Sequence, residues 1–237
     1  VSERGNKAYR ISLDNKLRTK LKILPIEGVP DDTDLEGVAW LGKGRLAFGT
    51  EGGVDGFATI LIAEERGAKL VVIESINLPQ VRLGLHVSSR RGTEGLCGVK
   101  GAIIAAIEET GSEDGRRWAP IVRVEHGAIT RVHKLWLTSQ SGKISGLDCT
   151  IAADGSIHAL AIERHFEITH LLTFVLPAGE GDITPTIALD LGPVINGKLN
   201  LEGIVWTSNG VIAVIDNQYN AISGPSELLV FKPGVVK

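Results

Sequence analysis

The chain has 237 residues, and its formal net charge of −3 at pH 7 gives no electrostatic basis for binding nucleic acid or an anionic membrane. No apolar stretch approaches the length of a membrane-spanning helix. With 43% hydrophobic residues and 29 glycines, the composition is typical of a packed, turn-rich fold rather than of a disordered chain. No linker-like segment interrupts the sequence, so we assign residues 1–237 to a single domain.

Strand signals follow one another along the whole chain. Two come near the N-terminus, at 9–13 and 19–24. Three groups of four follow, with Gly-containing turns between the strands: 35–40, 45–50, 57–63 and 69–77; 93–98, 102–107, 119–125 and 129–137; 145–151, 157–163, 169–176 and 183–190. A shorter fourth group has three strands, at 201–206, 211–215 and 227–231.

Each group opens with the same short motif, whose glycines are Gly37, Gly95, Gly146 and Gly203, at intervals of 58, 51 and 57 residues. A strand-rich repeat of this period predicts an all-β fold in which small sheets are arranged radially, a β-propeller. Four blades is the direct count, and five is the alternative. Because the fourth group is short, we expect the N-terminal strands to complete it and so close the ring.

Two pairs of residues give further expectations. Cys97 and Cys149 lie one position out of register in their repeats, so strand alternation predicts that they point to opposite faces and remain buried thiols. Trp40 and Trp206 occupy the same position in the first and fourth repeats. We expect both indoles to be buried between blades.

The repeats also deliver acidic residues to two matched positions. Glu36, Glu94 and Glu202 precede the motif glycine, and Ser145 takes this place in the third repeat. The second strands of the four repeats end in Glu51, Glu108, Glu163 and Asp216. Since the first strand of each blade lines the channel of a propeller, these seven carboxyl groups are expected at or near a channel mouth.

Clustered carboxylates repel one another, and a hard cation such as Ca²⁺ is one remedy. We assign Glu51, Glu108, Asp216 and Asn217 as candidate metal ligands. Two structural interpretations compete with this assignment. The Glu-Gly acids could lock neighbouring blades through backbone N–H groups, or arginines could neutralise the acids as ion pairs. The candidate arginines are Arg45, Arg90, Arg91 and Arg164.

Glu163 and His165 are the candidate catalytic residues, because both stand at a predicted channel end, where an acid or an imidazole can activate water. Arg90, Arg91 and Arg164 are candidates for binding an anionic substrate. The structural interpretations are a solvated turn histidine and a solvated basic loop. The sequence has no Gly-x-Ser-x-Gly motif, so it does not support a serine nucleophile.

Three pairs of segments resemble a known family: 91–96 with 107–108, 144–147 with 161–166, and 201–204 with 215–217. These pairs are similar to blades of the phytase-like esterase family. The resemblance spans about residues 30–232 and implies a propeller that is usually exported, hence a periplasmic or secreted protein. The pair Asp216-Asn217 is also similar to the metal site of the calcium-dependent lactonase propellers.

Two classes of function remain open. The first is a metal-assisted hydrolase of an ester, lactone or phosphoester at the acidic channel mouth. The second is a non-catalytic propeller that binds a small ligand or a protein partner. A cation with an open coordination position favours the first class, and a channel filled by arginine–glutamate pairs favours the second.

Overall fold

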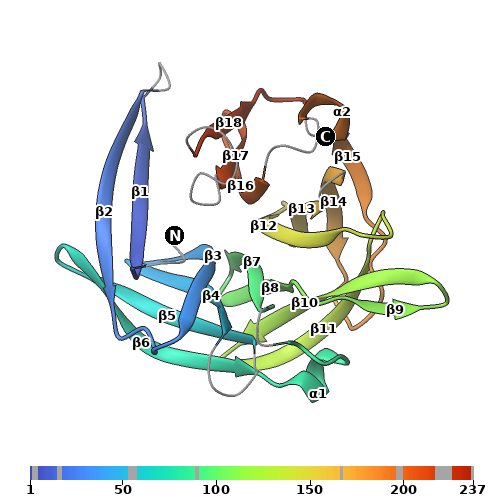
Figure 1. The fold of residues 1–237 in the computed structure, drawn as a ribbon, viewed down its shortest axis with the longest axis horizontal. Helices are drawn as coiled ribbons and strands as arrows, with labels where there is room; N and C mark the ends of the chain where they lie inside the picture. The colour runs from blue at the N-terminus through green and yellow to red at the C-terminus, as the bar shows by residue number, and fades with distance from the viewer. Residues whose placement is uncertain are drawn as a thin grey trace.

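In the computed structural model, small β-sheets stand around a common centre (Figure 1). The structure describes residues 1, 5–14, 18–52, 58–88, 91–165, 168–195, 200–216 and 226–235. Four sheets form the four blades of a propeller, which confirms the predicted fold class and the direct count of blades. No helix in the described ranges is long and apolar enough to cross a membrane.

The strands of each blade are antiparallel and follow chain order outward from the centre. Blade 1 contains β3 (Thr33–Gly42), β4 (Arg45–Gly52), β5 (Ala58–Arg66) and β6 (Lys69–Leu78). Blade 2 contains β7 (Thr93–Val99), β8 (Ala102–Ile107), β10 (Arg116–Glu125) and β11 (Ala128–Trp136), and the short β9 (Gly111–Glu113) pairs with β10. Blade 3 contains β12 (Lys143–Ile151), β13 (Ile157–His165), β14 (Ile168–Leu176) and β15 (Thr186–Asp190). Blade 4 contains β16 (Asn200–Thr207), β17 (Gly210–Asp216) and β18 (Leu228–Phe231).

The predicted strands of the repeats agree with these bounds to within a few residues, apart from 183–190. There, Ile183 forms an isolated parallel bridge with Leu135 of blade 2, and β15 starts at Thr186. Two single-turn helices, α1 (Gln80–Leu83) and α2 (Gly192–Ile195), join blades and were not predicted.

Blades 2 and 3 each lie between two other blades and contact a different neighbour with each face of the sheet. Leu96 of β7 packs into a cluster with blade 1, whereas the next residue, Cys97, packs into a cluster with blade 3. These faces are dry and apolar: the side chains of Ile104, Ile107 and Ile121 are fully buried. Burial between blades therefore accounts for the near-continuous apolar runs at the second strands.

The motif glycines permit close approach of the first strands. A Cβ on Gly37 would overlap the carbonyl oxygen of Glu94 in the next blade, and one on Gly95 would meet Leu147 in the blade after that. A Cβ on Gly203 would meet only Val214 of its own sheet. The repeated glycine is thus explained by packing of each blade on its successor, and blade 4 has no successor in this position.

The N-terminal strands do not complete blade 4, which corrects the predicted ring closure. Instead, β1 (Lys7–Leu13) and β2 (Thr19–Glu27) form a hairpin, and β2 pairs in parallel with β6 at the outer edge of blade 1 (Figure 1). Leu24 and Ile26 of this hairpin pack with Leu35 and Phe48, on the face of blade 1 that is turned away from blade 2. The hairpin therefore shields the apolar face of blade 1 from water, and it is the segment that precedes this blade in the sequence.

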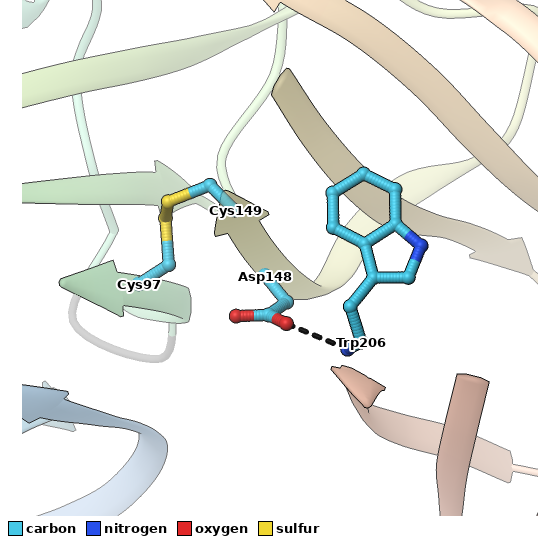
Figure 2. The surroundings of a disulfide bond; sticks show 4 residues. All are labelled: Cys97, Asp148, Cys149 and Trp206. Carbon is cyan, nitrogen blue, oxygen red and sulfur yellow. Dashed lines mark hydrogen bonds between the residues drawn. A yellow bond between two sulfur atoms is a disulfide. The ribbon is translucent and has the colours of Figure 1, made fainter. Parts of the chain in front are cut away.

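Cys97 and Cys149 form a disulfide between β7 and β12, with the Cα atoms 5.7 Å apart (Figure 2). The prediction of two free thiols was wrong because neighbouring blades contact each other through opposite faces of their sheets. A residue on the forward face of blade 2 meets a residue on the backward face of blade 3. On the same inner strand as Cys149, Asp148 accepts a hydrogen bond from the backbone N–H of Trp206 in blade 4, at 2.6 Å.

The two tryptophans differ in burial, so the prediction of two buried indoles is wrong for Trp40 and holds only in part for Trp206, which is half-buried. Trp206 packs against the cluster formed by blades 3 and 4. Trp40 is 55% exposed. The preceding residue, Ala39, packs toward blade 2, so alternation turns the Trp40 indole to the other face, where blade 1 has no neighbouring blade.

Candidate functional site

A β-bulge lies at each repeat motif, near the start of the first strand of each blade. In all four blades the register between the first and second strands shifts at the residue before the motif glycine. In blades 2, 3 and 4 the extra residues are Glu94, Ser145 and Glu202; in blade 1 the bulge contains Glu36 and Gly37. A bulge re-aims the side chain of its extra residue, and here it gathers polar groups where the first strands begin.

Lys143 is the centre of the first ion-pair group. Its ammonium forms an ion pair with Glu108 and lies 4.0 Å from a carboxylate oxygen of Glu94. Glu94 and Glu108 are 8% and 4% exposed, so both acids are held inside the protein. The second carboxylate oxygen of Glu108 is buried and has no hydrogen-bond partner among the described residues.

Arg164 is the centre of the second group. Its guanidinium pairs with Glu202, with Nε 3.3 Å from one carboxylate oxygen. The side-chain amide of Asn200 donates to Glu202 at 2.7 Å and to Asp216 at 3.3 Å. Ser145, which replaces the acid in the third repeat, donates its hydroxyl to the carbonyl of Leu201 at 2.8 Å. That bond links blade 3 to blade 4, but it runs from a hydroxyl to a carbonyl, whereas the predicted lock was an acid that accepts from backbone N–H groups.

The two groups influence each other electrostatically. Burial raises the pKa of Glu94 well above its usual range, and the negative charges of Glu202 and Glu36 raise it further, against the opposing effect of Lys143 and Arg164. Burial also raises the pKa of Glu202, although Arg164 and Lys143 partly offset the effect. We call the residues Glu94, Glu108, Lys143, Arg164, Asn200, Glu202 and Asp216 the acidic channel site.

Of the candidate catalytic residues, Glu163 is completely buried and fully engaged. Its carboxylate accepts hydrogen bonds from the backbone N–H groups of Thr138 and Ser139 at 2.9 and 3.0 Å and from both of their hydroxyls at 2.5 Å. These four bonds anchor the segment that joins β11 to β12, so the geometry leaves Glu163 little capacity to activate water. His165 is exposed at the end of β13.

The candidate anion-binding arginines do not lie together. Arg164 belongs to the acidic channel site, whereas Arg91 forms an exposed ion pair with Glu109 at 3.0 Å. Arg90 lies outside the described residues.

The candidate metal ligands do not form a cation site in the described part of the chain. Glu108 is paired with Lys143, Asp216 is bonded to Asn200, and Asn217 lies outside the described ranges. Across those ranges, no group of three or more His, Cys, Asp or Glu side chains is arranged to hold a metal ion, and this includes Glu51. The cationic side chains of Lys143 and Arg164 already lie against the acids that would have to bind Ca²⁺. The residues present therefore do not fit this ion.

Sequence reasoning missed Lys143 and Asn200, which stand two positions before Ser145 and Glu202. The corresponding residues of the first two repeats are Asp34 and Gly92. A signal was therefore available: the repeat that loses its acid gains a lysine next to it. What the alignment of repeats could not show is that Lys143 bonds acids of the preceding blade.

No protein-family model matches the chain, and no curated protein matches it. Solved structures give distant similarities. A hypothetical protein from Leishmania major is 13% identical over 87% of this chain and 71% of that chain, with a TM-score of 0.41. A putative 6-phosphogluconolactonase from Bacteroides uniformis is 13% identical over 96% and 60% of the two chains, with a TM-score of 0.44. The GH32 β-fructofuranosidase of Bombyx mori is 9% identical over 96% and 48%, with a TM-score of 0.47. None of these similarities bears on activity.

Proposed function

We propose that the protein is a non-catalytic propeller that binds a small polar molecule at the acidic channel site. The observation that carries this proposal is the pattern of ion pairs: Lys143 and Arg164 already neutralise Glu108 and Glu202. Of the two classes left open by the sequence, a channel filled by such pairs favours the binding protein. One acceptor, the second oxygen of Glu108, is left without a partner among the described residues.

The charge balance indicates the class of ligand. The site holds four carboxyl groups, Glu94, Glu108, Glu202 and Asp216, against the cations of Lys143 and Arg164, so carboxylates outnumber cations even when Glu94 is neutral. A buried acceptor that lacks a donor is unfavourable, and a ligand that supplies O–H or N–H groups relieves this. A hydroxyl-rich neutral molecule or an amine fits this balance better than an anion does.

A matched series of sugars tests the proposal by isothermal titration calorimetry. Glucosamine, glucose and gluconate are similar in size and carry a positive, a neutral and a negative charge. We expect the affinity to fall in that order, and we expect Glu108→Gln to weaken glucosamine binding by about tenfold. Glu113→Gln, on the exposed strand β9, is the control. Tightest binding of gluconate, or no binding of any of the three, would contradict the proposal.

A hydrolase is the second candidate, and the observation that favours it is the raised pKa of Glu94. A carboxyl group with a raised pKa holds its proton to higher pH than usual, and it can then act as a general acid beside an ionised partner. The motif resemblance to the phytase-like esterase family suggests esters or phosphoesters as substrates. Hydrolysis of p-nitrophenyl acetate or p-nitrophenyl phosphate that Glu94→Gln lowers in kcat, with KM unchanged, would support this candidate.

Export to an oxidising compartment is part of the proposal. A disulfide between blades is stable in the periplasm or outside the cell, whereas cytosolic thiols are kept reduced. Mass spectrometry of the protein isolated from its native compartment under alkylating conditions tests this, since free Cys97 and Cys149 would contradict it.

A further inference from the structure

A cavity lies between blades 1 and 2, at the opposite end of the strands from the acidic channel site. Its volume is about 560 Å³. Three hairpin turns border it: the β3–β4 turn, the β7–β8 turn at Lys100 and the β10–β11 turn at His126. The volume is within the range of small-molecule sites, about 300–1,000 Å³.

The floor of this interblade cavity is apolar. Ile62 and Ile76 contribute from blade 1, and Ile103 and Val124 contribute from blade 2. All four are buried members of the apolar cluster between these blades. An apolar floor with a few polar groups around it is the usual construction of a site for a small organic molecule.

Arg45 is the polar group that points to a ligand. It pairs across the sheet with Glu64, but that acid is bonded to Arg66, and Glu65 is bonded to Arg10. Within the described ranges, the guanidinium of Arg45 forms no ion pair, and its buried Nε–H has no hydrogen-bond acceptor. A buried N–H without an acceptor is rare in folded proteins, and the Nε edge of a guanidinium matches the two oxygens of a carboxylate.

The charges around the rim agree with this assignment. Lys100 and His126 stand at the turns, and Lys100 forms no ion pair with the described residues. Glu74 is the one acid among the residues that line the cavity. With Arg45 and Lys100 against Glu74, the lining has a net positive charge even when His126 is neutral, the opposite of the balance at the acidic channel site.

We propose that the interblade cavity binds a small carboxylate with an apolar body, whose carboxylate pairs with Nε and one Nη of Arg45 and whose body rests on the isoleucines. The two ends of the propeller then take ligands of different chemistry. This proposal is independent of the function proposed for the acidic channel site.

Calorimetry with phenylacetate and its uncharged analogue phenylacetamide tests the proposal on the unmodified protein. We expect phenylacetate to bind with one site per chain and the amide to bind at least tenfold more weakly, because the amide cannot form the charged pair with Arg45. Equal affinities for the acid and the amide, or no binding of phenylacetate at 10 mM, would overturn the proposal.

Three variants locate the binding. Arg45→Met should weaken phenylacetate binding at least tenfold, while Arg18→Met, at an exposed arginine that pairs with Asp14 and does not line the cavity, should leave it unchanged. Glu74→Gln should strengthen binding about two- to fivefold, because it removes the opposing charge, and a gain of affinity cannot result from misfolding. Unchanged affinity in both Arg45→Met and Glu74→Gln would show that the ligand binds elsewhere and refute the assignment.

Discussion

Replacing Glu94 by Gln is expected to stabilise the protein at alkaline pH and to flatten the dependence of its stability on pH. The carboxyl group of Glu94 is buried in blade 2 and faces the negative charges of Glu202 and Glu36, which together with burial raise its pKa. Lys143 and Arg164 face the same group and oppose the shift without cancelling it. The folded protein therefore favours the neutral form of Glu94 more strongly than the unfolded chain does.

The direction of the pH effect follows from proton linkage. A raised carboxyl pKa means that the folded protein binds more protons than the unfolded chain between the ordinary value, 4.5, and the folded value. The free energy of unfolding then falls as pH rises through this window, by about 1.4 kcal/mol per pH unit for one proton. Glutamine stays neutral at all pH values, so it removes this loss. Glu202 also has a raised pKa and should leave a residual slope in the variant.

Urea denaturation followed by tryptophan fluorescence at pH 4.5, 6, 7 and 8, without reductant, measures the effect. We expect the two proteins to be closest in stability at pH 4.5 and the variant to gain stability over the unmodified protein as pH rises. Glu227→Gln, at an exposed position just before β18, is the control and should not change the slope. Identical slopes for the unmodified protein and Glu94→Gln would show that Glu94 titrates normally and that the reasoning from burial is wrong.

Four further predictions concern the fold and the metal. Replacing both Cys97 and Cys149 by Ala should lower the free energy of unfolding by about 4 kcal/mol, from the closure of a loop with a sequence separation of 52 residues; no change in the urea midpoint would contradict this. Leu24→Ala should cost about 2–5 kcal/mol, because the 2%-exposed side chain covers blade 1, and a loss below 1 kcal/mol would argue against the hairpin as a cover. Trp40→Ala should cost only about 0.5 kcal/mol and Trp206→Ala clearly more, and the reverse order would refute the burial argument. The chelator EDTA should leave the melting temperature unchanged, because cationic side chains neutralise the acids; a fall of several degrees, restored by calcium, would revive the predicted calcium site.

The blades and most of their strands could be predicted from the sequence, because they depend on interactions between residues close together in the chain. The four glycine-led motifs and the apolar runs after them determined the blades and the strands, because period-two burial and the close approach at each glycine act over a few neighbouring residues. The positions of Glu94 and Glu202 near one channel end followed in the same way, since the strand that carries each acid also sets its height in the blade. The resemblance to phytase-like esterases remains a prediction.

Tertiary structure decided what depends on contacts between blades. Cys97 meets Cys149, and Lys143 meets Glu108, because each residue projects toward the neighbouring sheet, a direction that alignment of equivalent positions does not reveal. The N-terminal hairpin joins β6 rather than blade 4, although its alternation suits either edge, because Leu24 finds a complementary apolar face there. A repeat motif specifies the blade, whereas pairing between blades depends on which faces come together, and only the assembled packing determines that.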